Sequence, residues 1–219
     1  MKNIPDRNLA FEYENNFYLT SKPARLSKAL AHFKMLEMVA NIEGDIVEFG
    51  VFKGASFCRF ASYRKILNLE SKKLVGFDSF GEFPLTEFED DKVFRQKFID
   101  DAGLHSITTE SLFSFLEQKM CSNNIELIKG DIVQTSKDYI KNNPGQKICL
   151  LNLDVDIYEP SKAVLENFYE KISTGGILIL DDYLTFPGET KAIVDFIKDK
   201  GVKISPPLFE GTPYFIQKL

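Results

Sequence analysis

The sequence predicts an α/β fold built around a mostly parallel sheet, and two apolar runs carry this prediction. Residues 147–158 begin as an apolar β run and end in polar side chains, and residues 176–183 repeat this design. The residues between the two runs have apolar positions at helical spacing and a Gly-Gly stop. Because strand–helix–strand crossovers are right-handed, the two strands should run parallel and end at the same edge of the sheet.

Carboxylates follow both of these strands: Asp154 and Asp156 after the first, Asp181 and Asp182 after the second. Open α/β sheets bind their ligands at the carboxyl ends of the strands. Four negative charges packed there persist only if a cation lies among them, or if some of them are protonated. Oxygen ligands without His or Cys favour Mg²⁺ or Mn²⁺ over Zn²⁺.

The N-terminal part of the chain predicts a covering segment followed by a helix. Residues 1–23 have no clear period and suggest a loop or short helix. Residues 21–42 carry an apolar stripe, with Ser21 or Ser27 as the cap. The stripe consists of Leu26, Leu30, Phe33, Leu36 (or Met35) and Val39–Ala40. His32 lies on this helix, and we interpret it as an ordinary surface or core histidine.

A strand at 45–49, a glycine turn and a helix from Ala55 follow, with the spacing Glu48-x-Gly50-x-x-x-Gly54. Such a turn presents backbone N–H groups to a nucleotide-like ligand, although many glycine turns serve packing alone. The acidic residue suits a positively charged ligand better than a pyrophosphate. The next strand, within 72–80, ends at Asp78, 30 residues after Glu48. This is the position from which an acidic residue binds ribose hydroxyls in Rossmann-like sites, although a loop cap is the alternative.

The second half predicts one long loop and the remaining elements of the sheet. Residues 81–110 are charged and irregular, which is typical of a lid or binding loop, and His105 there is a candidate general base. A short helix, a strand ending at Gly130-Asp131, and a helix capped by Thr135 or Ser136 come next. After the two opening strands, a helix and a terminal hairpin over 202–219 complete the chain, which adds an antiparallel strand at the sheet edge.

Composition favours one α/β domain over the 219 residues, with 1–43 as an N-terminal cap and helix and 44–219 as the core. The net charge of −5 argues against a nucleic-acid partner. No apolar run is long enough to cross a bilayer, and the N-terminus lacks a hydrophobic signal region. Three cysteines without metal or redox spacing fit a reducing cytoplasm. A homo-oligomer is compatible with the sequence.

Several segments together resemble the macrocin O-methyltransferase family of S-adenosylmethionine-dependent enzymes. They are GDIVEFGVFKGAS, LVGFDSF, GDIVQTS, the long block LLNLDVDIYEPSKAVLENFYEKISTGGILILDDY, and KAIVDF, which span about residues 44 to 200. Two features depart from the family pattern. Its usual D-[ST]-F-E-G-F-P has Gly and Glu exchanged at Gly81-Glu82, and Asp131 stands where many members carry an aromatic residue.

The resemblance implies a Rossmann-like class I methyltransferase fold, with helices on both faces of a seven-stranded sheet whose last strand is antiparallel. It implies S-adenosylmethionine as cofactor, Mg²⁺ (or Mn²⁺) as metal, and a sugar or glycan hydroxyl as methyl acceptor. Asp154, Asp181 and Asp182 would hold the metal, and Asp156 would be the catalytic base. The implied cofactor contacts are Glu48, Gly50, Gly54 and Ser56 along the methionine part, Asp78 and Ser79 at the ribose, and the Gly130-Asp131 turn.

The residues agree with this chemistry independently. A metal bound to adjacent hydroxyls lowers their pKa, and a carboxylate beside the metal can then take the proton. Asp156 is two residues beyond Asp154, so on a continuing strand both side chains would point to one face. Proximity to the cation would keep Asp156 ionised. A catechol acceptor would suit the same metal chemistry.

Two other functions compete with this one. Asp154-Val155-Asp156 is a D-x-D pattern, which is typical of metal-dependent glycosyltransferases. That reading leaves Glu48 and Asp78 unexplained, and it requires basic residues for a diphosphate, whereas none is apparent near these carboxylates. The other alternative is a non-catalytic binding protein on a methyltransferase fold, against which the intact carboxylates argue. An iron-dependent hydroxylase would need a histidine-bearing iron site, which the sequence lacks.

Overall fold

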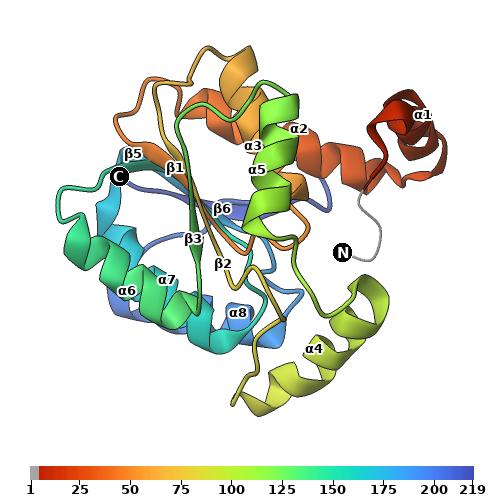
Figure 1. Cartoon of the computed structure of the whole chain (residues 1–219). Coiled ribbons are helices and arrows are strands. Elements are labelled where there is room, and N and C mark those ends of the chain that lie inside the picture. Colours follow the sequence, from red (N-terminus) through yellow and green to blue (C-terminus); the bar gives the residue numbers. More distant parts are fainter. Residues whose placement is uncertain (1–4) are drawn as a thin grey trace.

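The computed structural model describes residues 5–219, in which one mixed sheet lies between two layers of helices (Figure 1). The six strands have the order β3-β2-β1-β4-β5-β6. They are β1 (Asp45–Phe49), β2 (Leu74–Asp78), β3 (Ile125–Lys129), β4 (Ile148–Leu153), β5 (Ile172–Leu180) and β6 (Tyr214–Gln217). The first five pair in parallel, and β6 pairs antiparallel with β5.

The α-helices are α1 (Ala10–Thr20), α2 (Pro23–Met38), α3 (Ala55–Ile66), α4 (Glu89–Ala102), α5 (Thr109–Gln118), α6 (Ile132–Asn142), α7 (Tyr158–Phe168) and α8 (Pro187–Lys200). Two short 3₁₀ helices, η1 (Arg7–Leu9) and η2 (Tyr169–Lys171), complete the elements. Among the described residues, no helix combines the length and apolar character that crossing a membrane requires.

Alternating strand residues contribute side chains to two hydrophobic cores, one on each face of the sheet. Val47, Phe49 and Leu151 pack on one face against side chains from α6, α7 and α8. Ile46 and Leu150 point to the opposite face, where α2, α3 and α5 supply the packing partners. Successive side chains of a strand point to opposite faces of the sheet, so every second residue lies on the same face. Polar strand residues follow this alternation as well and lie in the same two layers as the apolar ones.

The predicted seventh strand is absent from the sheet of the described residues. The segment expected to form the first arm of the terminal hairpin makes a single bridge, between Ser205 and Phe215. Pro206 and Pro207 follow at once, and proline has no N–H with which to continue a ladder. The hairpin therefore reduces to β6, and the sheet has six strands rather than seven.

Three local predictions about helix ends and faces were also wrong. α2 begins at Pro23 after Lys22, so neither Ser21 nor Ser27 caps it. Its predicted apolar stripe is buried at Met35, Leu36 and Val39 but exposed at Leu26 and Leu30. α6 starts earlier than expected and is capped by Asp131 instead of Thr135 or Ser136. The Gly-Gly pair at 175–176 does not stop a helix, because it lies inside β5.

The division of the chain into a cap over 1–43 and a core over 44–219 stays a prediction. α1 contributes no buried residue, and in Figure 1 it projects from the body of the molecule beyond the start of α2. The following helix, α2, packs on α3 and so belongs to the layer that covers the sheet.

Candidate active site

A cavity of about 560 Å³ lies at the carboxyl ends of the parallel strands. Seven of the sequence-predicted site residues line it: Gly50, Asp78, Ser79, Gly130, Asp131, Asp154 and Asp156. Its apolar walls include Phe83 and Phe98 from the segment between β2 and β3. Parallel strands bring these residues together because all their carboxyl ends share one edge of the sheet.

Gly50 connects the end of β1 to this cavity in a conformation that requires glycine. Its φ is +90°, and a Cβ at this position would lie 1.6 Å from the carbonyl oxygen of Asp154. The backbone leaving β4 therefore passes directly against the glycine turn. Packing explains this glycine as well as a ligand does, and both roles meet at one position.

Asp78 is buried and joins three loops around the cavity. Its Oδ2 accepts a hydrogen bond from the Phe52 N–H (2.8 Å), and its Oδ1 accepts from the Phe80 N–H (2.7 Å) and the Ser106 hydroxyl (2.7 Å). Each carboxylate oxygen can accept about two hydrogen bonds, so Oδ2 retains one lone pair that is free for a ligand. Asp78 is thus a loop cap and a residue of the cavity wall at the same time.

Asp131 also has a structural role beside its place in the cavity. Its Oδ1 accepts from the Val133 N–H over 2.9 Å and caps α6. Gly130, just before it, has a φ of +144° and bonds through its N–H to the Asp78 carbonyl at the end of β2. The turn after β3 is therefore held against the turn after β2, and both face the cavity.

Glu48 and Ser56 are paired, but neither is among the residues that line the cavity. The Ser56 hydroxyl donates to Glu48 Oε1, and the Glu48 side chain is fully buried on β1. Burial raises the pKa of Glu48 to about 8, against the opposing effects of Ser56 and Arg59. The second oxygen, Oε2, has no hydrogen-bond partner among the described residues.

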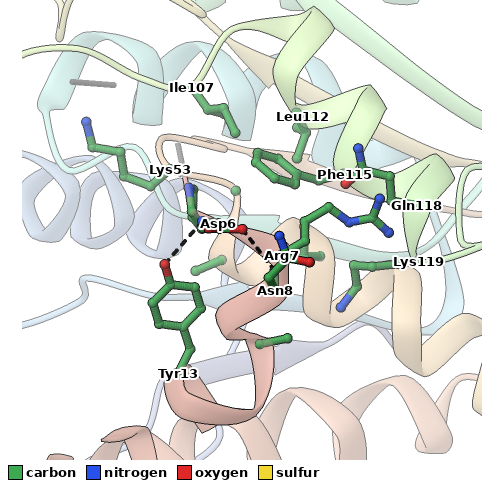
Figure 2. A pocket seen from close by; sticks show the side chains of 15 residues that line it. Asp6, Arg7, Asn8, Tyr13, Lys53, Ile107, Leu112, Phe115, Gln118 and Lys119 are labelled. Atoms are coloured by element: carbon green, nitrogen blue, oxygen red, sulfur yellow. Dashed lines mark hydrogen bonds between the residues drawn. The ribbon is translucent and has the colours of Figure 1, made fainter. Parts of the chain in front are cut away.

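Gly54 faces a second, larger cavity of about 1000 Å³ (Figure 2). This cavity lies between the segment from Pro5 to Tyr13, the start of α3, and α5. The strand-end carboxylates are not among its lining residues. Asp6 points its carboxylate at the Asn8 N–H (2.9 Å), while its own N–H donates to the Tyr13 hydroxyl (3.1 Å). The two glycines of the turn thus face different cavities.

Asp154, Asp181 and Asp182 form the group we call the acidic site. One carboxylate oxygen of each lies within 4.8 Å of the others, a spacing that can hold a metal ion. Burial, followed by repulsion from neighbouring carboxylates, raises the pKa of Asp154 and of Asp182 well above the ordinary range. Three oxygen donors without nitrogen or sulfur fit Mg²⁺ or Mn²⁺. The residues present therefore fit the metal that the sequence implied.

Helix α2 brings a cation to this site that sequence analysis missed. The Lys28 ammonium donates to Asp181 Oδ2, and His32 Nε2 lies 3.7 Å from Asp181 Oδ1. Burial pushes the pKa of Asp181 upward, but Lys28 and His32 outweigh it and bring that pKa to about 2. The expectation that no basic residue lies near these carboxylates was wrong. The available signal was the i,i+4 spacing of Lys28 and His32, which puts both on one helix face.

Asp156 lies beside the acidic site, but not on a continuing strand. β4 ends at Leu153, and Asp156 has a φ of +65° in the loop before α7. The expected common strand face for Asp154 and Asp156 is therefore wrong, although the Asp156 carboxyl is still close enough to Asp154 and Asp182 for each to affect its pKa. Burial, and then repulsion from Asp154, raise the pKa of Asp156 well above its usual range.

Residues 81–110 are more regular than expected, because Glu89–Ala102 within them form helix α4. The role of this segment as a lid or binding loop stays a prediction. Asp91 of α4 accepts hydrogen bonds from the backbone N–H groups of Tyr158 (2.9 Å) and Gly188 (2.7 Å), at the starts of α7 and α8. In return, Glu159 of α7 accepts from the Glu87 and Phe88 N–H groups before α4. Gly188 must be glycine, because a Cβ there would lie 1.9 Å from the Asp91 carboxylate.

His105 does not join the acidic site. It is exposed and lies in a bridge with Glu82, and its neighbour Ser106 lines the cavity in its place. Asp154 and Asp156, after β4, also line that cavity, whereas His105 does not. As a general base, His105 has no contact with the strand-end carboxylates.

The strand order, the antiparallel last strand and a cavity at the carboxyl ends of the parallel strands define the class I methyltransferase fold. Solved structures agree: the calicheamicin methyltransferase CalS11 aligns with a TM-score of 0.74 and 24% identity over 99% of this chain and 87% of its own. The O-methyltransferase NovP aligns with a TM-score of 0.76 and 19% identity over 88% and 79%.

The chain belongs to the macrocin O-methyltransferase (TylF) family, whose model matches residues 24–210. The family predicted from the sequence is confirmed. Demethyldecarbamoylnovobiocin O-methyltransferase of Streptomyces niveus is 25% identical over 161 residues, covering 71% of this chain and 59% of the relative. Mycinamicin III 3''-O-methyltransferase of Micromonospora griseorubida is 24% identical over 166 residues, covering 74% and 63%. The chain thus spans about three fifths of these relatives' length.

Proposed function

We propose that this protein is an S-adenosylmethionine-dependent O-methyltransferase that methylates a sugar hydroxyl with the help of a divalent cation. The observation that carries the proposal is the acidic site, with three carboxylate oxygens within 4.8 Å of one another beside the cavity. Family membership supports the cofactor and the reaction. The names of relatives that methylate sugar positions support the acceptor class, as in a rhamnosyl tetracenomycin 4'-O-methyltransferase of Streptomyces olivaceus.

The cofactor fits the cavity that Gly50, Asp78 and Gly130 line. Asp78 Oδ2 keeps one lone pair for a ribose hydroxyl, and its other bonds hold the surrounding loops in place. When bound, the cofactor supplies a methyl group on a positively charged sulfur. Glu48 and Ser56 do not line this cavity, so any effect they have on the methionine part is indirect.

A divalent cation held by Asp154, Asp181 and Asp182 would lower the pKa of an acceptor hydroxyl beside it. Asp156 then takes the hydroxyl proton onto its carboxylate. Burial and Asp154 raise the pKa of Asp156, which disfavours its charged form. A nearby double positive charge favours the ionised carboxylate, so the cation would help to keep Asp156 in the form that accepts a proton.

The decisive experiment incubates the protein with methyl-labelled cofactor and a panel of nucleotide sugars, glycosylated polyketides and catechols. Label should appear in a sugar acceptor with Mg²⁺ or Mn²⁺, disappear in EDTA and return on adding the metal. Label transfer that persists in chelator would exclude the metal role. Transfer to catechols alone would exclude the sugar acceptor. Titration calorimetry that compares the binding of S-adenosylhomocysteine with that of a nucleotide sugar distinguishes this function from the glycosyltransferase alternative. A methyltransferase should bind S-adenosylhomocysteine, whereas a glycosyltransferase should bind the nucleotide sugar.

A further inference from the structure

The acidic site contains a positive charge supplied by the chain itself. Lys28 is on α2, 153 residues away from Asp181 in sequence, and its ammonium donates to Asp181 Oδ2. Among the described residues, no other Lys or Arg forms an ion pair with Asp154, Asp181 or Asp182. The Asp181 side chain is only 3% exposed, so this contact takes the place of water around a buried carboxylate.

The ammonium and a divalent cation would bind the same carboxylate, that of Asp181. Both must lie close to the Asp181 carboxylate, and the attraction of Asp154 and Asp182 acts on Lys28 as well. Two cations held a few ångströms apart in a buried site repel each other strongly. A metal bound by the three carboxylates would therefore be incompatible with the ammonium in its present position.

Lys28 is able to leave, whereas its neighbour His32 is not. The Lys28 side chain is 24% exposed at the end of a long flexible stem, and Leu30 nearby on the same helix is open to solvent. His32 is fully buried and stacks on Phe60 at a ring distance of 5.0 Å. Loss of the ammonium would still leave the Asp181 carboxylate beside the fixed histidine ring.

We infer that Lys28 is the exchangeable cation of the acidic site: it neutralises Asp181 when no metal is bound, leaves when a divalent cation binds, and so sets the affinity for that cation. This inference rests on the metal site proposed above. It makes Lys28 a residue that controls metal affinity, in contrast to a fixed structural ion pair. Such a pair would keep its geometry with and without the metal.

The test compares metal-stripped wild-type protein with Lys28→Met and, as a matched control on the same helix, Lys34→Met. Lys34 is 55% exposed and pairs only with Glu37 among the described residues, so its removal leaves the acidic site unchanged. Calorimetric titration with Mn²⁺ should show binding to Lys28→Met about tenfold tighter or more than to the wild type and to Lys34→Met. In EDTA, Lys28→Met should melt at a lower temperature than both, and Mn²⁺ should abolish this difference.

A labelling experiment on the wild type removes any dependence on the variant folding. Acetylation by a soluble N-hydroxysuccinimide ester, followed by peptide mass spectrometry, should modify Lys28 several-fold faster in saturating Mg²⁺ than in EDTA, with Lys34 unchanged. Equal labelling of Lys28 in both conditions while Mg²⁺ binds, or equal Mn²⁺ affinity in Lys28→Met and wild type, would overturn the exchange. Failure of every form to bind Mn²⁺ or Mg²⁺ would instead overturn the metal site itself.

Discussion

The Glu189 carboxylate, in the first turn of α8, accepts a hydrogen bond from the Asp182 N–H over 2.9 Å. Its other oxygen lies 3.4 Å from the Val155 N–H, and the Glu189 N–H donates to the Asp156 carbonyl over 3.1 Å. One fully buried side chain thus joins the loop after β4 to the loop after β5. The acidic site is assembled from exactly those two loops, so Glu189 controls its geometry without contacting a ligand.

Replacing Glu189 with Ala should lower the free energy of unfolding by about 2–4 kcal/mol, because two buried N–H groups lose their acceptor and a cavity forms. Mn²⁺ affinity should fall in parallel as the two loops separate. Glu189→Gln keeps an acceptor oxygen and should retain most of both properties. Urea unfolding and metal titration measure these effects. The exposed Glu166→Ala on α7 is the control and should change stability by no more than about 0.5 kcal/mol. A similarly small effect of Glu189→Ala would contradict the bridging role.

Glu48 should make the stability of the metal-free protein depend on pH. Burial raises its pKa from 4.5 to about 8, so the folded state binds a proton that the unfolded state releases between these values. The stabilisation is fully present below about pH 4.5 and is lost as the pH rises through about 8. Glu48→Gln, which still accepts from Ser56, should flatten this contribution and be more stable than wild type at pH 8.5. Thermal melts in EDTA at several pH values measure this, and parallel curves for the two proteins would exclude the shift.

Asp78→Asn should weaken the binding of S-adenosylhomocysteine about 10- to 100-fold, because a charge-assisted bond to the ribose becomes a neutral one. Asp78→Asn keeps one oxygen that can accept hydrogen bonds from the loops. Asp78→Ala would remove every loop hydrogen bond, so its effect on the loops could not be separated from the loss of the ribose contact. Ser106→Ala is the matched control, since it removes a loop contact of Asp78 and leaves its charge. Titration calorimetry should show a smaller loss for Ser106→Ala. Equal losses in both variants would assign Asp78 to the loops alone.

Asp156→Asn should reduce turnover about 10²- to 10⁴-fold with cofactor affinity nearly unchanged. Asparagine tolerates the left-handed backbone at this position, so the fold should survive the change. Steady-state kinetics with the acceptor found by the panel, together with S-adenosylhomocysteine titration, give the two readouts. His105→Ala is the comparison, and its exposed position predicts near-normal turnover. The opposite pattern, with His105 essential and Asp156 dispensable, would move the base to the loop histidine.

The sequence by itself determined the parallel strands and the residues at their carboxyl ends. Asp78, Asp154 and Asp181 follow apolar runs whose lengths and turns are local properties of the chain, and right-handed crossovers bring their ends to one edge. The failed local predictions have local causes too. Pro206 and Pro207 interrupt the terminal hairpin, and β4 ends at Leu153, before the left-handed Asp156.

Only the tertiary structure decided what surrounds those carboxylates. Lys28 reaches Asp181 across 153 residues, and Glu189 ties together two loops that the pattern of strands leaves independent. Apolar periodicity predicts that α2 has a buried face, but not which strand end that face meets. The angle at which a helix lies on a sheet results from the simultaneous packing of many side chains. The partner of a buried charge is therefore decided only when the whole core is assembled.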